Sequence, residues 1–241
     1  MGGAVKLCMR FIRAKREYVV VSVGGSLIVP DGIDVSFLKR FRELIVSKTR
    51  AGLSFFIITG GGRTARNYQG AVAEVRGGLN RDDVDWLGIH SSRLNAHLMR
   101  AVFKEEAQAR IVKNPSHRIR AKMPVIIGAG WKPGWSTDYC AVIAAKTLGA
   151  KKLVNLSNIT HVYTADPKQD PSATPIETIG WAEFRKLIPA EWDPGLSSPF
   201  DPVAAREAEK IGLEVAIMNG GNLEEFDKYL SHQPFTGTVI S

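Results

Sequence analysis

Three glycine-rich turns carry the residues of this sequence that could do chemistry. Each follows a short apolar run and precedes a stretch with helical spacing: Gly24-Gly25-Ser26, Gly60-Gly61-Gly62, and residues 128–138. Glycine lets backbone N–H groups approach a phosphate, and the first turn of the following helix adds positive potential. Arg63 and Arg66, one helical turn apart, could bind oxyanions beside the second turn. We therefore expect phosphorylated ligands at these turns, with tight-turn geometry and a solvated helix start as the alternatives.

The third turn, GAGWKPGWSTD, holds glycines, two tryptophans, two hydroxyls and a carboxylate. Ser136, Thr137 or Asp138 could equally serve as the cap of the helix that follows. The sequence contains no G-x-S-x-G, H-E-x-x-H or phosphate-loop lysine motif, and its five histidines lack the spacing of metal ligands. Three anion-binding turns without such a motif indicate that two phosphorylated ligands meet at one site.

Strands and helices must alternate to bring these turns together. Short runs of β-branched and other apolar residues predict strands at 18–23, 53–59, 124–127, 152–156 and 214–218. Apolar spacing and caps predict helices after Asp34, from Arg63, and at about 83–104, 137–148 and 202–211. This alternation is typical of an α/β fold in which helices cover both faces of a parallel sheet. Ligands bind at the carboxyl ends of the strands in such folds, which is where the glycine turns lie.

Two segments depart from a simple alternation. Residues 158–175, rich in proline and without a helical period, follow the fourth strand, so we expect a functional loop at the ligand edge of the sheet. The helix at 83–104 has more apolar residues than one buried stripe needs. We therefore expect a subunit contact or a second core layer on this helix, involving Trp86, Leu87, Ile89, Leu94, Leu98, Met99 and Val102.

The composition excludes a disordered, collagenous or coiled-coil chain. The 241 residues, with 44% apolar and 23% charged side chains, are ordinary for a globular enzyme. No apolar run is long enough for a transmembrane helix, so we expect no membrane partner. The net charge of +8 suits an anionic ligand, but no recognition motif supports nucleic-acid binding. Two cysteines, Cys8 and Cys140, fit a reducing cytoplasm. Residues 1–17, with five basic residues and one acidic residue, are expected to be an extension to a single domain at 18–241.

Five motifs in order carry a family resemblance: GGS (24–26), GGGRTAR (60–66), GWKPGWSTD (130–138), NLSNITHVYTADPKQDP (155–171) and SSPFDPVAA (197–205). Together with a closing GTVI at 237–240, they resemble the amino-acid-kinase superfamily, and within it the archaeal-like branch of the UMP kinases. The resemblance implies a three-layer α/β/α sandwich with a mainly parallel central sheet. It also implies ATP-dependent phosphorylation of UMP to UDP in pyrimidine biosynthesis, with Mg²⁺ as cofactor, by a homohexamer.

The resemblance also implies a role for individual residues. Asp201 would organise the phosphoryl-transfer site, and Arg66 would act there as the nearest cation. The residues implied at ATP are Gly25, Ser26, Gly62, Arg66, Ser157, Tyr163 and Asp166. Asp85 would accept hydrogen bonds from the UMP ribose, and the other residues implied at UMP are Gly61, Gly130, Trp131, Lys132, Pro133, Gly134, Trp135 and Ser136. No residue is assigned to a metal.

The sequence departs from the family pattern at three places. Thr160 and His161 stand where the family has an acidic residue and a glycine, and Trp131 and Trp135 replace smaller or polar residues. Ser22 occupies a position where many members have a lysine. Two alternatives to UMP phosphorylation stay open: a phosphotransferase of the superfamily with a carboxylate, carbamate or other phosphate as acceptor, and a non-catalytic protein that stores oxoanions.

Overall fold

A seven-stranded sheet organises the part of the chain that the computed structural model describes, residues 16–78, 80–120, 122–191 and 198–241. Its strands, in spatial order, are β3 (Val125–Gly128), β2 (Ser54–Thr59), β1 (Tyr18–Val23), β4 (Lys152–Ser157), β8 (Glu214–Asn219), β9 (Thr238–Ile240) and β7 (Thr178–Ile179). The first five are parallel, β9 is antiparallel to β8, and β7 is parallel to β9. The expected mainly parallel sheet is confirmed.

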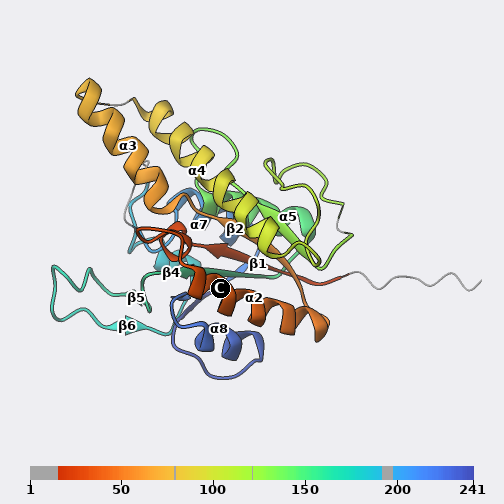
Figure 1. Ribbon diagram of the computed structural model, residues 1–241. Coiled ribbons are helices and arrows are strands. Elements are labelled where there is room, and N and C mark those ends of the chain that lie inside the picture. The colour runs from red at the N-terminus through yellow and green to blue at the C-terminus, as the bar shows by residue number, and fades with distance from the viewer. Residues whose placement is uncertain (1–15, 79, 121, 192–197) are drawn as a thin grey trace, which may run out of the picture.

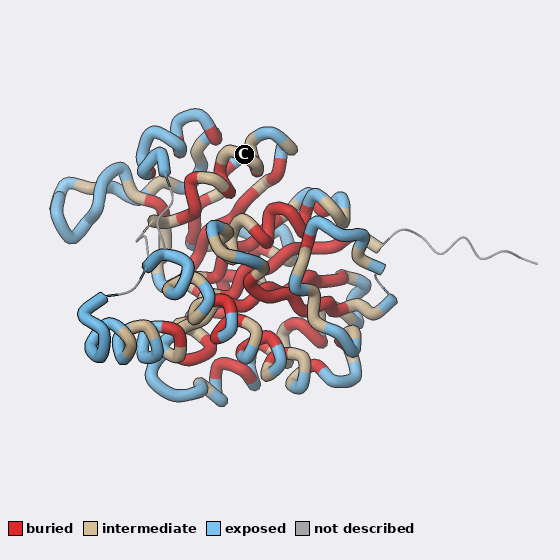
Figure 2. Tube along the Cα trace, turned by 90° about the horizontal axis from the view of Figure 1, so that it is seen from above, coloured by how far each residue is buried: buried red, intermediate tan, exposed pale blue. Residues whose placement is uncertain are grey.

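Side-chain alternation along β1 shows how helices cover both faces of the sheet. Val19, Val21 and Val23 pack in one core with α2 (Val35–Arg50) and α8 (Leu223–Leu230). Tyr18 and Val20 pack in a second core on the opposite face. The helices of that second layer are α5 (Thr137–Leu148), α6 (Trp181–Phe184) and α7 (Pro202–Lys210). The result is the three-layer α/β/α sandwich, with the buried chain gathered at its centre (Figure 2).

Two long helices extend beyond the sheet. The pair consists of α3 (Gly62–Arg76) and α4 (Arg81–Val102), which run side by side and project from the body of the molecule (Figure 1). The carboxyl-terminal half of α4 reaches the core through Ala96 and Met99. The segment after α4 then covers the sheet edge, because Ala107 and Val112 form parallel bridges with β3.

Most predicted elements agree with the structure to within two residues. The exceptions are short pieces that the sequence did not indicate: α1 (Gly25–Ile28), α6, α8, β7, β9, and a small antiparallel pair of β5 (Val162–Tyr163) and β6 (Pro175–Ile176). Strands of two or three residues are too short to show a period, whereas α8 has an Asn222 cap that the prediction overlooked. Within the described residues, no helix is long and apolar enough to span a bilayer. All but the last two residues of the expected extension, and the first serine of the SSPFDPVAA motif, lie outside the described residues.

Candidate active site

The first two glycine turns pack directly against each other at the carboxyl edge of the sheet. A Cβ atom on Gly25 would clash with the backbone nitrogen of Gly62, and one on Gly62 would clash with the carbonyl of Gly25. Gly62 also has a φ of +65°, which strains any other residue. Hydrogen bonds to neighbouring strands fix both turns: Gly24 N donates to Leu156 O (2.8 Å) and Gly60 N donates to Val23 O (3.0 Å). The sequence therefore needs glycine at both turns to bring their backbones together.

Helix α4 also holds the second glycine turn, Gly60-Gly61-Gly62, in place. The amide Nδ2 of Asn95 donates to the carbonyl oxygens of Gly60 (2.8 Å) and Gly61 (3.2 Å). Thr59, at the end of β2, and Ser92 exchange two side chain-to-backbone hydrogen bonds of 3.0 and 2.8 Å. All four bonds are buried or partly buried, so the turn and the helix behave as one rigid unit.

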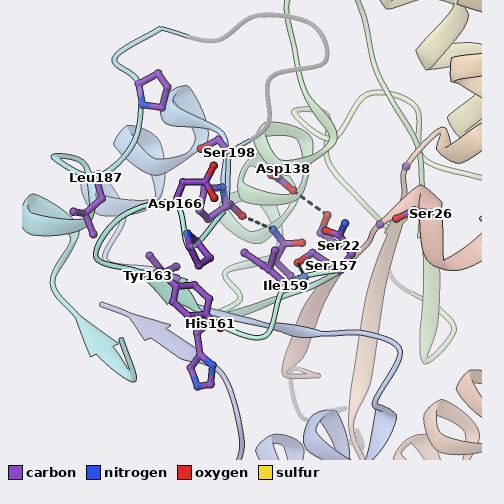
Figure 3. A pocket seen from close by; sticks show the side chains of 18 of the residues that line it. Ser22, Ser26, Asp138, Ser157, Ile159, His161, Tyr163, Asp166, Leu187 and Ser198 are labelled. Atoms are coloured by element: carbon purple, nitrogen blue, oxygen red, sulfur yellow. Dashed lines mark hydrogen bonds between the residues drawn. The ribbon is translucent and has the colours of Figure 1, made fainter. Parts of the chain in front are cut away.

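A cavity of about 530 Å³ opens at this edge of the sheet, beside the first glycine turn (Figure 3). Its size lies within the range of small-molecule sites, roughly 300–1,000 Å³. Of the residues expected at ATP, five line it: Gly25, Ser26, Ser157, Tyr163 and Asp166. Gly62 and Arg66, both in the described part of the chain, are not among its lining residues, and Arg66 is exposed as the fifth residue of α3.

Asp138 lines this cavity, and a second carboxyl group, that of Asp201, lies next to Asp138 without being among the lining residues. Ser22 Oγ donates a hydrogen bond of 3.1 Å to Asp138 Oδ1, across to the first turn of α5 (Figure 3). Burial raises the pKa of Asp138 to about 7, and the neighbouring Asp201 adds to this rise while the Ser22 hydrogen bond opposes it. Asp201 is the buried cap of α7, accepting from Ala204 N at 2.6 Å. Burial raises the pKa of Asp201 too, against the hydrogen bonds from Ala204, Ser136 and Val203.

The proline-rich segment after β4 forms the opposite wall. Its small β5–β6 pair is attached to the main sheet through Val162 N, which donates to Thr238 Oγ1 at 2.8 Å. Thr160 Oγ1 lies 3.1 Å from the Tyr163 hydroxyl, and the His161 and Tyr163 rings meet edge to face at 6.3 Å. Thr160 and His161, the two residues of this segment that depart from the family pattern, thus both contact Tyr163. The segment therefore lies at the carboxyl edge of the sheet, as the sequence predicted.

Several residues expected at UMP form a second region, between α4 and the segment 129–136, here called the acceptor loop. A cavity of about 430 Å³ lies between the start of α4, Gly134 and α7, and Asp85 and Gly134 are the two residues expected at UMP that line it. Gly134 N donates to Asp85 Oδ2 at 2.7 Å. Burial raises the pKa of Asp85, and the Gly134 hydrogen bond opposes this rise.

The other residues expected at UMP take structural positions in and beside the acceptor loop. Trp131 and Trp135 pack on each other at 5.6 Å between ring centroids, Trp135 packs on Tyr139 at 4.0 Å, and Lys132 Nζ lies 4.7 Å from the Trp131 ring centroid. Ser136 caps α5 by accepting from Tyr139 N at 3.0 Å, as the capping alternative predicted. The remaining three are placed as follows: Gly130 N donates to Ser92 Oγ, Pro133 is partly buried, and Gly61 packs against α4.

The family is decided by a match between residues 17–219 and the sequence model described as the amino acid kinase family. The chain belongs to the amino acid kinase family. The uridylate kinase of Methanocorpusculum labreanum is 32% identical over 225 residues, 92% of this chain and 94% of that protein. The uridylate kinase of Pyrococcus abyssi is 33% identical over 207 residues, 83% of this chain and 89% of that protein.

A solved structure supports the same placement within the amino acid kinase family. The crystal structure of uridylate kinase from Archaeoglobus fulgidus superposes with a TM-score of 0.78 and 26% identity, covering 92% of this chain and 99% of that one. The UMP kinase structure from Bacillus anthracis, at 19% identity and a TM-score of 0.75, shares the fold. The expected fold and superfamily are therefore confirmed.

Among the polar residues that line the large cavity, the sequence interpretation gave no binding role to Ser22, Asp138 and Asn155. Ser22 was noted as a replaced lysine, Asp138 as the carboxylate of the third turn and a possible cap, and Asn155 only as the first residue of a motif. Alternation along the strands carries a signal for two of them, because Ser22 shares the face of Val20 toward α5, where Asp138 begins the helix. Parallel pairing then puts Asn155 opposite Ser22 on β4.

Proposed function

We propose that this chain transfers the γ-phosphoryl group of ATP to UMP, giving UDP and ADP. A phosphate oxygen of UMP attacks the γ-phosphorus, and the bond from that phosphorus to the β–γ bridging oxygen breaks. The observation that carries the proposal is the pair of packed glycine turns beside a nucleotide-sized cavity, in a chain whose relatives of similar length are named uridylate kinase.

The large cavity suits the donor nucleotide. Gly25 and Ser26 offer backbone N–H groups and a hydroxyl for the phosphates, and the 157–166 segment offers Tyr163 and Asp166 for the nucleoside. The second cavity suits the acceptor, with Asp85 for the ribose hydroxyls and the acceptor loop for the phosphate and base. Neighbouring residues of the chain contribute to the two cavities, because Gly134 lines the second and Thr137 and Asp138, at the start of α5, line the first.

Mg²⁺ fits the donor set at the large cavity. Magnesium prefers oxygen ligands and is commonly bound by one or two carboxylates together with substrate phosphates. Asp138, which lines the large cavity together with Gly25 and Ser26, and the neighbouring Asp201 supply such oxygens. Among the described residues no group of three or more acidic, histidine or cysteine side chains could hold a metal ion by itself, so the substrate phosphates would complete the set of ligands. When bound, Mg²⁺ would neutralise charge on the phosphates, and Asp201 would help to hold it or orient the groups that donate to the phosphates.

Asp201 does not act as a base in this proposal, because a UMP phosphate oxygen is already an anionic nucleophile. Phosphoryl transfer depends instead on positioning and on positive charge around the transferred group. Ser22 brings no charge where many family members have a lysine. We assign this positive charge to Arg66, the fifth residue of α3, whose side chain would fold back toward Gly62 at the start of the helix.

An assay of ADP release tests the function across UMP, CMP, dUMP, aspartate, N-acetylglutamate and carbamate. Turnover with UMP alone supports the proposal, and turnover with a carboxylate or carbamate favours the other phosphotransferases of the superfamily. Turnover with none of these acceptors favours the storage protein. Against that alternative, Tyr163 and Asp166 both line the cavity, and a chain that no longer binds ATP would not need to keep these two residues together. We further propose that the enzyme is a cytoplasmic homohexamer.

A further inference from the structure

Arg93, which has no role in the function proposed above, makes two of the hydrogen bonds that hold the acceptor loop to α4. Arg93 reaches from α4 to two consecutive carbonyl oxygens, donating from Nε to Gly130 O at 3.2 Å and from Nη2 to Trp131 O at 2.7 Å. Its neighbour Ser92 accepts from Gly130 N at 2.8 Å. Three adjacent backbone groups at the start of the loop are therefore bonded to two adjacent residues of one helix.

Helix α4 also holds the second glycine turn and includes Asp85. Ser92 also bonds the end of β2, and Asn95, three positions further along, donates to the carbonyls of Gly60 and Gly61. Asp85, two helical turns before Ser92, accepts from Gly134 N on the same loop. Arg93 thus connects the acceptor loop to a helix that also holds the second glycine turn, so it helps to set the distance between the loop and that turn.

Aromatic side chains of the loop and of α5 pack against the second core. Trp131, Trp135 and Tyr139 pack in series, with Lys132 over the two indoles. Neither tryptophan is among the residues that line the two cavities of the described chain. The loop is consequently held both by this stack and by Arg93, whose guanidinium carbon lies 6.0 Å from the Trp86 ring centroid.

We propose that Arg93 is a positioning residue that holds the acceptor loop in the shape that binds the acceptor nucleotide. This role rests on the proposed function, because it assigns the loop to the acceptor. Arg93 contacts the backbone of the loop and is not among the lining residues of the donor cavity. Its loss should therefore raise the KM for UMP with little effect on the KM for ATP.

Arg93→Met tests this role, because it keeps an unbranched apolar stem beside Trp86 and removes every donor. We expect the KM for UMP to rise roughly tenfold or more, since hydrogen bonds from a charged donor are the strong ones, while kcat changes less than about threefold. Arg93→Lys, with a single point charge in place of a planar fork, should restore part of the loss. Arg100→Met, a partly exposed arginine near the end of α4, is the matched control and should leave both KM values unchanged.

Amide hydrogen exchange of the ligand-free protein gives a readout that needs no catalysis. In Arg93→Met, amides of residues 129–136 should exchange about tenfold faster or more, with the sheet and α5 unaffected. A local increase together with the KM change supports the proposal. An unchanged KM for UMP, unchanged exchange in the loop, or faster exchange throughout the chain in both Arg93 variants would overturn it. If the wild-type enzyme prefers another acceptor, the proposed function fails, and the same KM comparison with that acceptor still decides the role of Arg93.

Discussion

Ser22 and Asp138, 116 positions apart in the chain, are joined by a hydrogen bond of 3.1 Å between the end of β1 and the first turn of α5. The bond stabilises an ionised Asp138, but burial and the nearby Asp201 outweigh it and raise the Asp138 pKa to about 7. In an unfolded chain an aspartate titrates near 3.9. The site is therefore built at a cost in stability that depends on pH.

Asp138→Asn should stabilise the ligand-free protein at alkaline pH and not at acidic pH. Between about pH 4 and pH 7 the folded state holds a proton that the unfolded state releases, so the free energy of unfolding falls as pH rises through this window. Asparagine cannot ionise and still accepts from Ser22. We expect a gain of roughly 1–3 kcal/mol at pH 8 that disappears near pH 4. Urea unfolding in EDTA, without nucleotide, measures both values.

Glu43→Gln, which neutralises an exposed carboxylate on α2, is the control for that experiment. Its free energy of unfolding relative to the wild type should vary little across the same pH range. An Asp138→Asn protein that is no more stable than the wild type at pH 8 would show that Asp138 ionises in the folded state as readily as in water.

Arg66→Ala should lower kcat by about 10²–10³, the usual effect of losing one charge-assisted donor at a transferring group. The KM for UMP should change less. Arg63→Ala is the matched control, because Arg63 is held 3.0 Å from Asp31 by an ion pair and should lose little activity. Steady-state kinetics decides between them. Activity without a divalent ion, or an Arg66→Ala enzyme within about threefold of the wild type, would mean that another cation does this work.

Asp85 should make the enzyme prefer UMP over dUMP. A site that accepts a hydrogen bond from a substrate hydroxyl discriminates against the analogue that lacks it. Asp85→Asn can still accept from Gly134 N, so the acceptor loop keeps its attachment while one ribose acceptor is lost. We expect the KM for UMP to rise and that for dUMP to stay nearly constant. Equal efficiency on both substrates before and after the change would remove Asp85 from the acceptor site.

Much of this fold follows from local patterns in the sequence. The run YVVVSV fixes β1, and the Asp34 and Ser136 side chains cap α2 and α5. The glycine turns and the 158–175 segment could be placed at one edge, because parallel strands put their carboxyl ends there. The Ser22–Asp138 hydrogen bond and the Arg93 contacts could not, because each joins segments whose register and helix rotation are set only by tertiary packing.

Helix α4 should take part in self-association. Its apolar excess is left at the surface in the described structure, where Leu94 is 62% exposed and Trp86 41% exposed, with Tyr68 of α3 at 62%. Apolar side chains gathered on a projecting helix pair are typical of an interface.

In a symmetric dimer one substitution places a charge on each subunit, so Leu94→Glu should weaken the contact from both sides. Val35→Glu, at an equally apolar and 55% exposed position on α2, is the control. Light scattering at micromolar concentration should give a multiple of 26.4 kDa for the wild type and the control, and a smaller mass for Leu94→Glu. A wild-type mass of one chain would contradict self-association, and a Leu94→Glu mass equal to that of the wild type would place the interface elsewhere.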